Sequence, residues 1–420
     1  MKKRVLVRGP ALSRSGYGEQ TRFAIRALRS REDIFEVHVK NMPWGRTGQI
    51  SMNSEDYAWI AQRGIATDAY IKQGGQFDIA IPVTVPNEFE RLAPITIGYT
   101  AGIETTKVAP VWLQKTNQTV DKVVVVSDHS KQVFQNTHYT MTQPDGRPAG
   151  ELSLNIPIET VNYPVRQTEA TEMDLNLATE NNFLLLSQWA PRKNMENTIR
   201  WFVEKFLDDE TVGLVVKTNT ASDSIIDREQ TQKRMENVLA SYENRKCKIY
   251  LIHGELTPGE LTWLYQHPTM KALINIGHGE GYGLPLFEAA YNGLPLLTVA
   301  WSGHMDFICK PNKKGKSYPR VNRVDYNLLP VQKEAVWNGV IQADSMWAFA
   351  KESSYKKALG DAIEKEVHYR KEAKALQEYI LEKFSEENVY AQFCNAILEE
   401  NLHESFYDNS LKEIAMSSLI

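Results

Sequence analysis

Short apolar runs bounded by turn residues alternate with amphipathic stretches along the chain, and the alternation occurs twice. Such runs are typical of buried parallel strands joined by helices, so we expect two doubly wound parallel sheets. In the first half the pattern predicts helices over about 19–28 and after Ser130, and strands at 4–8, 35–39, 79–83, 95–99 and 123–127. In the second half it predicts helices near 195–206, 228–242, 258–267 and 286–291, and strands at 183–187, 213–217, 248–252, 272–276 and 295–299.

The length of 420 residues favours two domains over one compact core. A polar stretch without periodicity separates the two patterns and predicts a hinge, and the chain ends in a long run of helix formers. We therefore expect Rossmann-like domains at 1–166 and 183–385, a hinge at 167–182 and a helical tail at 386–420. The carboxyl ends of both sheets would face one central cleft, where such folds bind ligands.

The composition of the chain argues against several classes of protein. The chain is 42% hydrophobic and 24% charged, with 48 Lys and Arg against 52 Asp and Glu, so no overall positive charge recruits nucleic acid or an anionic membrane. The three cysteines lie far apart and form no C-x-x-C, which favours a reducing cytoplasm over a disulfide framework. We expect no signal peptide and no transmembrane anchor, because no apolar run is long enough.

The segment from Ile276 to Ala290, I-G-H-G-E-G-Y-G-L-P-L-F-E-A-A, carries the most chemical information. It follows a predicted strand, and its glycines let backbone approach a ligand closely around Glu280. Pro285 suits a helix start, where free N–H groups attract phosphate, and Glu288 would lie on that helix. Carboxylates beside an anion site fit sugar hydroxyls, which donate hydrogen bonds to them, so the segment indicates a nucleotide sugar.

Glu280 and Glu288, separated by seven residues, resemble the E-x7-E signature of family-4 retaining glycosyltransferases of the GT-B fold. The resemblance implies that Glu280 contacts the donor sugar and Glu288 the ribose, while the amides of Gly283 and Leu284 hold sugar and phosphate. The alternative is a glycine-rich strand-to-helix turn with surface carboxylates.

The resemblance extends to S-Q-W-A-P-R-K-N at 187–194, where the family has a basic motif that clamps the diphosphate. Lys193 matches that motif and is implied to act in catalysis and donor binding. The family arginine falls on Gln188, to which we assign no role, so either Arg192 binds the donor in its place or the diphosphate clamp is weaker. The alternative for both cations is a solvated helix start capped by Asn194.

Three further segments match less specifically. Glu255 and Leu256 resemble the stretch beside the nucleobase, although a helix capped at Thr257 explains the same residues. Gly16 and Gly18 resemble the first loop over the donor diphosphate. Glu104 matches an acidic position in a subgroup and is expected to be catalytic, or else to be a carboxylate at the N-terminus of the next helix.

Histidine near the reacting sugar, frequent in the family, is absent from 97–106, and His304 is expected to be structural. No metal motif occurs, so no metal and no cofactor are expected. The resemblance then implies sugar transfer with retention of configuration, from a UDP- or GDP-linked donor, with the leaving phosphate assisting the acceptor.

The acceptor stays open among a glycan, a small metabolite and a hydroxymethylated nucleic-acid base. The region 44–76 is an acceptor-binding insertion or an ordinary helix and loop. A basic run over 310–323 would touch a phosphate backbone or be a solvated loop. Two other functions also stay open: another GT-B enzyme, such as a nucleotide-sugar epimerase, and a non-catalytic nucleotide-sugar-binding scaffold.

Overall fold

The computed structural model describes residues 2–142, 147–312 and 314–398. It divides the chain into two compact units. Unit 1 contains the chain up to Gly102, Lys107–Pro164 and the chain from Glu386, and unit 2 contains Ile103–Thr106 and Val165–Ser385. The chain therefore changes units at four points, and two of them enclose a segment of only four residues.

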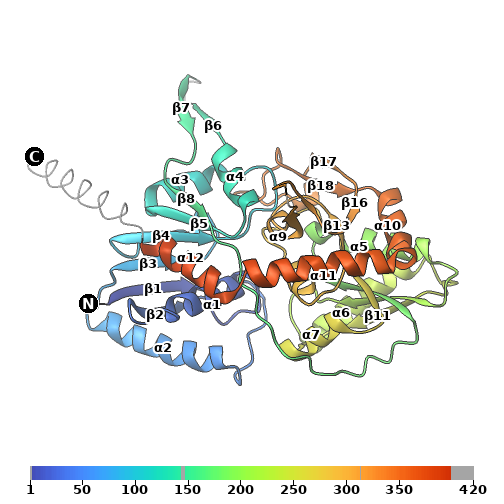
Figure 1. The fold of residues 1–420 in the computed structure, drawn as a ribbon. Coiled ribbons are helices and arrows are strands. Elements are labelled where there is room, and N and C mark those ends of the chain that lie inside the picture. The colour runs from blue at the N-terminus through green and yellow to red at the C-terminus, as the bar shows by residue number, and fades with distance from the viewer. Residues whose placement is uncertain (1, 143–146, 313, 399–420) are drawn as a thin grey trace, which may run out of the picture. The chain divides into compact units, whose positions relative to one another are not determined.

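Unit 1 is built on a six-stranded parallel sheet in the order β2-β1-β3-β4-β5-β8. Its β3, β4 and β5 are buried at every residue, which fits strands covered on both faces, although β4 contains two threonines and β5 begins with Lys122. Helices connect the strands (Figure 1). The elements are β1 Lys3–Gly9, α1 Gly16–Arg29, β2 Phe35–Asn41, α2 Glu55–Lys72, β3 Ile79–Pro82, η1 Pro86–Glu88, β4 Ile95–Thr100, α3 Pro110–Thr119, β5 Lys122–Val125, α4 Asp128–Asn136, β6 Tyr139–Thr142, β7 Pro148–Leu152 and β8 Ile158–Thr160.

Unit 2 repeats the plan with the sheet order β11-β10-β9-β12-β13-β16, again all parallel. The elements are β9 Asn181–Leu186, η2 Pro191–Lys193, α5 Met195–Lys205, β10 Val212–Lys217, α6 Ile225–Leu239, β11 Lys248–Ile252, α7 Pro258–Gln266, β12 Met270–Asn275, α8 Leu284–Tyr291, β13 Leu296–Val299, α9 Met305–Ile308, β14 Cys309–Pro311, β15 Ser317–Pro319, β16 Asn322–Val324, β17 Tyr326–Pro330, η3 Lys333–Ala335, β18 Met346–Ala350, α10 Glu352–Glu364 and α11 Glu366–Lys383.

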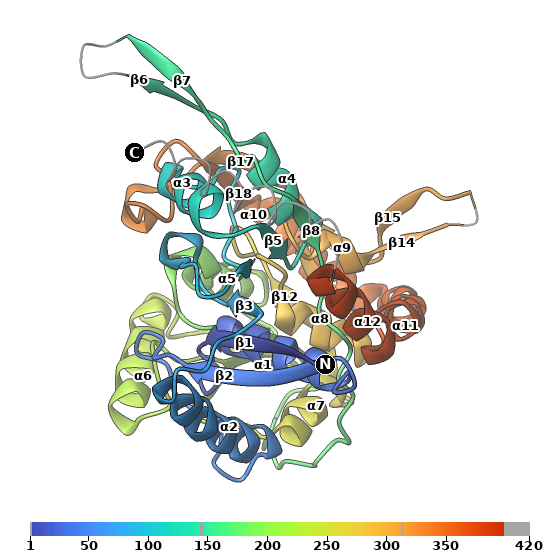
Figure 2. The ribbon, with the colours of Figure 1, turned by 90° about the vertical axis from the view of Figure 1, so that its left-hand side faces the viewer.

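The predicted fold class, with two doubly wound parallel-sheet domains, is confirmed. The sixth strand of each sheet, β8 and β16, was not predicted, because three residues are too few to form a recognisable apolar run. The hairpins β6–β7, β14–β15 and β17–β18 were missed as well. Figure 2 shows that β6–β7 and β14–β15 extend away from the sheet of their own unit.

The C-terminal helix α12, Glu386–Leu398, belongs to unit 1 and lies against α1 (Figure 1). Phe393 is fully buried, with its ring 5.1 Å from that of Phe23 and 5.3 Å from that of Tyr99. The buried Lys122 ammonium donates to the Ala396 carbonyl at 3.2 Å. The first part of the expected tail at 386–420 is therefore core structure of unit 1, and the remainder lies outside the described residues.

The expected hinge at 167–182 lies within unit 2, and the units change at its N-terminal side, between Pro164 and Val165. The Thr171 amide donates to the Gly259 carbonyl at 3.0 Å, and the Trp263 indole donates to the Met173 carbonyl at 3.2 Å. Hinge motion in this segment stays a prediction. Within the described part of the chain, no helix combines the length and hydropathy needed to cross a membrane.

Because Phe393 joins α12 to the core of unit 1, Phe393→Ala should lower the free energy of unfolding of that unit by about 3–5 kcal/mol. Hydrogen exchange with mass spectrometry across a urea series should show earlier opening of unit 1 peptides and unchanged unit 2 peptides. The matched control is Val367→Ala on α11, whose side chain is 86% exposed and should change neither unit. Equal loss in both units would contradict the assignment of α12 to unit 1.

Candidate functional site

Two adjacent strands of unit 2 end at the predicted site. β9 leads into η2, which carries Arg192 and Lys193, and β12 leads into the loop that carries Glu280. β9 and β12 pair in parallel, so their carboxyl ends lie at one edge of the sheet. The backbone joins them directly, since the His278 amide donates to the Arg192 carbonyl at 2.8 Å. Two motifs that are distant in the sequence thereby meet: Arg192 and Lys193 form hydrogen bonds with Glu280, which lies 88 and 87 residues further along the chain.

Glu280 lies between the two cations. Lys193 Nζ donates to both of its carboxylate oxygens, at 2.6 and 2.8 Å, and Arg192 Nη1 donates to Oε2 at 3.2 Å. Arg192 Nη2 also forms an ion pair with Glu104 at 3.3 Å. Two carboxylates face two cations, so the formal charge of this four-residue cluster is zero. The interpretation of Arg192 and Lys193 as a solvated helix start is wrong, because both side chains are largely buried and paired.

Two residues that the sequence analysis did not select fix the position of Glu280. Asn275 Nδ2 donates to Glu280 Oε1 at 3.0 Å, and the Glu280 amide donates to Ser302 Oγ at 2.9 Å. Ser302 has a φ of 77°, a left-handed conformation that a non-glycine residue adopts at a cost. Strain of this kind clusters at functional sites, but the sequence gives no sign of it.

The charges of the cluster control its pKa values. Burial raises the pKa of the Glu280 carboxyl, but Lys193 and Arg192, helped by hydrogen bonds, outweigh this effect and hold the pKa well below its usual range. Burial and the neighbouring Arg192 lower the pKa of the Lys193 ammonium. Burial alone would lower the pKa of Arg192, yet Glu104 and Glu280 raise it overall. Glu280 is therefore ionised at neutral pH, and Lys193 is the cation whose charge is held less firmly.

Glycines at Gly279, in this loop, and at Gly303, before α9, allow protein backbone to pack closely. A Cβ at Gly279 would lie 2.1 Å from the Glu104 carbonyl oxygen, and one at Gly303 would lie 1.9 Å from that of Gly281. Gly283, at φ 92°, is the N-cap of α8. The expectation that the glycines make room for a ligand is thus corrected at Gly279, where protein backbone occupies the space.

Glu104 lies in the four-residue segment 103–106, which packs with unit 2. The Thr106 amide donates to the Met346 carbonyl at 3.0 Å, and the Met346 amide donates to Thr106 Oγ1 at 2.9 Å. The alternative of a carboxylate at the N-terminus of the next helix is wrong, because α3 begins at Pro110 with Ala109 as its N-cap. A four-residue segment from the first half of the chain therefore completes the cluster.

The helix α8 supplies the second part of the site. No side chain caps its N-terminus, which consists of Gly283 and Leu284. Uncapped N–H groups with the positive end of the helix dipole favour an anion. Glu288 Oε2 accepts a hydrogen bond from the Tyr265 hydroxyl at 2.8 Å, and burial together with Glu288 raises the pKa of Tyr265 well above its usual value. Tyr265 thus orients the second glutamate of the motif.

Other predicted residues lie apart from the cluster. Glu255 and Leu256 precede α7, and the predicted cap is confirmed: Thr257 Oγ1 accepts from the Glu260 amide in a capping box. Gly16 and Gly18 belong to unit 1, at the start of α1. A Cβ at Gly18 would lie 2.0 Å from the Ser13 carbonyl oxygen, whereas nothing lies within 4 Å of one at Gly16.

The remaining sequence signals have structural partners. His304 is buried and bonds the Val299 carbonyl through Nε2 at 2.7 Å, as expected of a structural residue. Gln188 donates to the Thr220 carbonyl at 2.9 Å. In the basic run, Arg320 pairs with Glu372 at 2.7 Å, and Lys313 lies outside the described residues. Among the described residues, no group of three His, Cys, Asp or Glu side chains could hold a metal ion.

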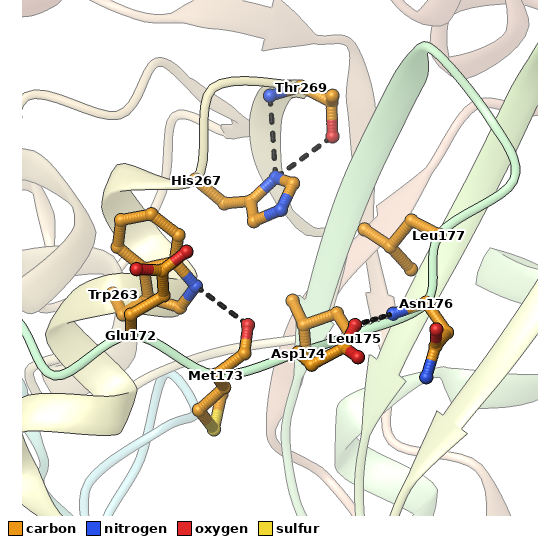
Figure 3. A pocket seen from close by; sticks show the side chains of 9 residues that line it. All are labelled: Glu172, Met173, Asp174, Leu175, Asn176, Leu177, Trp263, His267 and Thr269. Atoms are coloured by element: carbon orange, nitrogen blue, oxygen red, sulfur yellow. Dashed lines mark hydrogen bonds between the residues drawn. The ribbon is translucent and has the colours of Figure 1, made fainter.

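A pocket of about 440 Å³ lies elsewhere in unit 2, between residues 172–177 and the end of α7. Figure 3 shows Trp263 and His267 on one side and the chain around Asp174 on the other. The Trp263 indole donates to the Met173 carbonyl, and His267 Nδ1 accepts from the Thr269 amide at 3.4 Å. None of the predicted donor residues lines this pocket, so it does not belong to the site at Glu280.

Asp227, which the sequence analysis missed, organises the loop at the carboxyl end of β10. Its carboxylate accepts from the amides of Thr220, Ala221 and Ser222 at 2.7–3.1 Å and contacts His253 Nε2 at 2.9 Å. Burial would raise its pKa, but these hydrogen bonds lower the pKa to about 2. An aspartate in the first turn of a helix gives no sequence signal of such a role.

Comparison with known proteins identifies the fold. No protein-family model matches the chain. It is 24% identical over 200 residues to the serotype-specific mannosyltransferase WbdA of Escherichia coli; the match covers 45% of this chain and 22% of WbdA. The chain therefore spans only about a fifth of the curated relative that it matches.

Three solved structures cover nearly the whole chain. HepE of Anabaena, in complex with UDP-glucose, has a TM-score of 0.59 at 11% identity, and the match covers 94% of this chain and 99% of the HepE chain. Sucrose-phosphate synthase of Thermosynechococcus elongatus has a TM-score of 0.59 at 13% identity, and the match covers 97% of this chain and 100% of the synthase chain. The lipopolysaccharide outer core galactosyltransferase WaaB, in its apo form, has a TM-score of 0.52 at 14% identity. This match covers 94% of this chain and 99% of WaaB. The chain therefore has the GT-B fold, as the resemblance predicted.

Because the pKa of Asp227 falls from a usual 3.8 to about 2 on folding, its ionised form stabilises the protein above pH 4, and this contribution is lost as the pH falls from about 4 to 2. Asp227→Asn should lower the free energy of unfolding by about 2 kcal/mol at pH 7. The difference from the wild type should shrink toward pH 3 in urea titrations. Asp223→Asn, in the same loop with a 3.4 Å contact to Asn219, should change little. A constant difference across this range would contradict the prediction.

Proposed function

We propose that the chain is a glycosyltransferase that moves a hexosyl or related sugar from a nucleoside diphosphate to an acceptor hydroxyl with retention of configuration. One observation carries the proposal: two largely buried cations, a buried carboxylate and an uncapped helix N-terminus lie at the carboxyl edge of one parallel sheet. Cations and amide groups suit a diphosphate, and the carboxylates suit the hydroxyls of a sugar and a ribose.

Lys193 and Arg192 would bind the donor diphosphate. An ammonium has three donors, and within the described residues two hydrogen bonds from Lys193 go to Glu280, so a third can reach a phosphate oxygen. Arg192 would exchange its contact with Glu104 for a second phosphate contact. The leaving diphosphate gains negative charge during transfer, so fixed cations and the α8 amides would stabilise the transition state more than the ground state.

The glutamates would bind the sugars. Glu280 is ionised and held by Asn275 and Lys193, so it is preorganised to accept a hydrogen bond from a hydroxyl of the donor sugar. Glu288, oriented by Tyr265, would accept from the ribose. Gly283 and Leu284 would donate backbone amides to the donor. Glu255 and Leu256 are proposed to contact the nucleobase, and Gly16 and Gly18 to approach the diphosphate.

The relatives support the donor class. WbdA is named a mannosyltransferase and WaaB a galactosyltransferase, and HepE binds UDP-glucose, which favours a hexose on a UDP or GDP carrier. We propose same-face attack, in which the leaving phosphate takes the acceptor proton, so that no protein nucleophile is required. Three unpaired cysteines, Cys247, Cys309 and Cys394, suit a cytoplasmic enzyme.

The donor site can be tested by calorimetry with UDP, GDP, ADP and their sugar conjugates. One nucleotide should bind the wild type, and Lys193→Met should weaken it at least about tenfold because a charge-assisted phosphate contact is lost. Glu288→Gln should weaken the ribonucleotide but not inorganic pyrophosphate. Lys233→Met, an exposed lysine on α6, is the matched control and should bind normally.

With the donor known, the anomeric configuration of the product, measured by NMR, tests retention. A product with inverted configuration would contradict the retaining mechanism but not the proposed sugar transfer. Release of nucleotide and epimerised sugar without an acceptor would instead support an epimerase, and donor binding without turnover toward any acceptor would support a non-catalytic scaffold. If no nucleotide binds, the site assignment itself fails.

Glu104 should oppose donor binding, because its carboxylate competes with phosphate for Arg192. Glu104→Gln changes the formal charge of the cluster from zero to +1 and should tighten nucleoside diphosphate binding about three- to tenfold in calorimetry. If Glu104 also takes part in catalysis, turnover should fall in the same variant. Glu204→Gln, whose carboxylate pairs with Lys356 elsewhere in unit 2, should change neither quantity. Weaker nucleotide binding in Glu104→Gln would contradict the competition.

A further inference from the structure

A second pocket of unit 2 has a volume of about 460 Å³ and opens beside the end of η2. It lies between the start of α5, the helix α6 and the segment from η3 to β18. Its volume is in the range of small-ligand sites. The pocket shares a wall with the charged cluster, since Pro191 and His278 line it and directly precede Arg192 and Gly279 in the chain. None of the proposed donor residues lines it.

Aromatic rings form much of this wall. Trp189 from the loop after β9, Trp201 from α5 and Phe349 from β18 line the same pocket. Trp201 is only partly buried and packs on one side against Tyr355, with a ring distance of 6.1 Å. Flat aromatic faces in a pocket suit the C–H faces of a pyranose ring as well as other planar or apolar groups. The polar groups of the pocket therefore decide which class fits.

Polar side chains are interleaved with the rings. His278 Nδ1 lies 2.7 Å from the Ala348 carbonyl, which can only accept, so Nδ1 carries a proton. Gln332 Oε1 accepts from the Trp347 indole at 2.9 Å, and the Gln332 amide nitrogen lies 3.3 Å from His278 Nε2. The amide thus donates to Nε2, and the ring is neutral; burial lowers the pKa of His278 accordingly. This network fixes Gln332 at the pocket wall.

The charges of the pocket favour a neutral ligand. Arg234 lies over the Trp189 ring at 5.0 Å and forms an ion pair with Glu196 at 3.6 Å, while Glu334 adds a second carboxylate. Two carboxylates against one paired cation disfavour a phosphate or nucleotide. Amide and carboxylate groups among aromatic faces are a poor match for a purely apolar ligand, but they match the hydroxyls of a sugar.

We propose that this pocket is a binding site for a neutral oligosaccharide, separate from the donor site. The inference goes beyond the proposed function, because it rests on the pocket lining and holds whether or not a nucleotide binds at Glu280. Trp201 supplies the stacking face, and Asn197, Gln332 and Glu334 supply hydrogen bonds to hydroxyls. A growing glycan held here would remain bound to the protein beside the cluster.

The test is a saturation-transfer NMR titration with disaccharides of glucose, galactose and mannose, with and without saturating UDP. At least one disaccharide should bind saturably, and UDP should not displace it. Trp201→Leu, which keeps an apolar contact to Tyr355, should weaken binding about tenfold, and Glu334→Ala several-fold. Trp337→Ala is the matched control, because this tryptophan is 66% exposed on the same segment and does not line the pocket.

Circular dichroism establishes that each variant is folded; if Trp201→Leu is not, Glu334→Ala and Asn197→Ala decide. No saturable binding by any disaccharide, displacement by UDP, or equal binding by pocket variants and wild type would each overturn the inference. Failure of the proposed function gives a different result: disaccharides bind, whereas no nucleotide does. Nucleotide binding without disaccharide binding would support the proposed donor site and contradict the proposed oligosaccharide site.

Discussion

The ionised carboxylate of Glu280, buried between Lys193 and Arg192, is the interaction on which the rest of the site depends. A buried charge is stable only when opposite charges and hydrogen bonds compensate it, and removing one partner leaves an uncompensated ion. The cations, Asn275, and the backbone around Ser302 are all placed by this requirement. The cluster is formally neutral, so under the proposed function a diphosphate would compete with the carboxylates for the same cations.

This arrangement links binding to the protein's internal structure. Arg192 holds Glu104, and Glu104 belongs to a four-residue segment whose backbone presses against Gly279. A ligand that drew Arg192 away from Glu104 would therefore remove a contact that holds this segment within unit 2. Its flanking residues, Gly102 and Lys107, belong to unit 1.

The sequence predicted much of the fold because period and propensity are local properties. The strands β1–β5 and β9–β13 were recognisable as short, mainly apolar runs, since both faces of a parallel sheet are covered. It also singled out Glu280, Lys193, Arg192 and Glu104, through a resemblance rather than through their contacts. What it missed were β8 and β16, the packing of α12 on α1, and the roles of Asn275, Ser302 and Asp227, whose residue types are ordinary for their positions.

The sequence by itself determined two doubly wound sheets, a glycine-rich turn before a helix and two carboxylates seven residues apart, because these depend on neighbours along the chain. Only the tertiary structure decided that Glu280 pairs with cations about 90 residues away, that Glu104 joins them, and that Gly279 accommodates protein backbone. These features arise when distant strands are brought side by side. Charge compensation in a buried site depends on distances through space, which the order of residues does not contain.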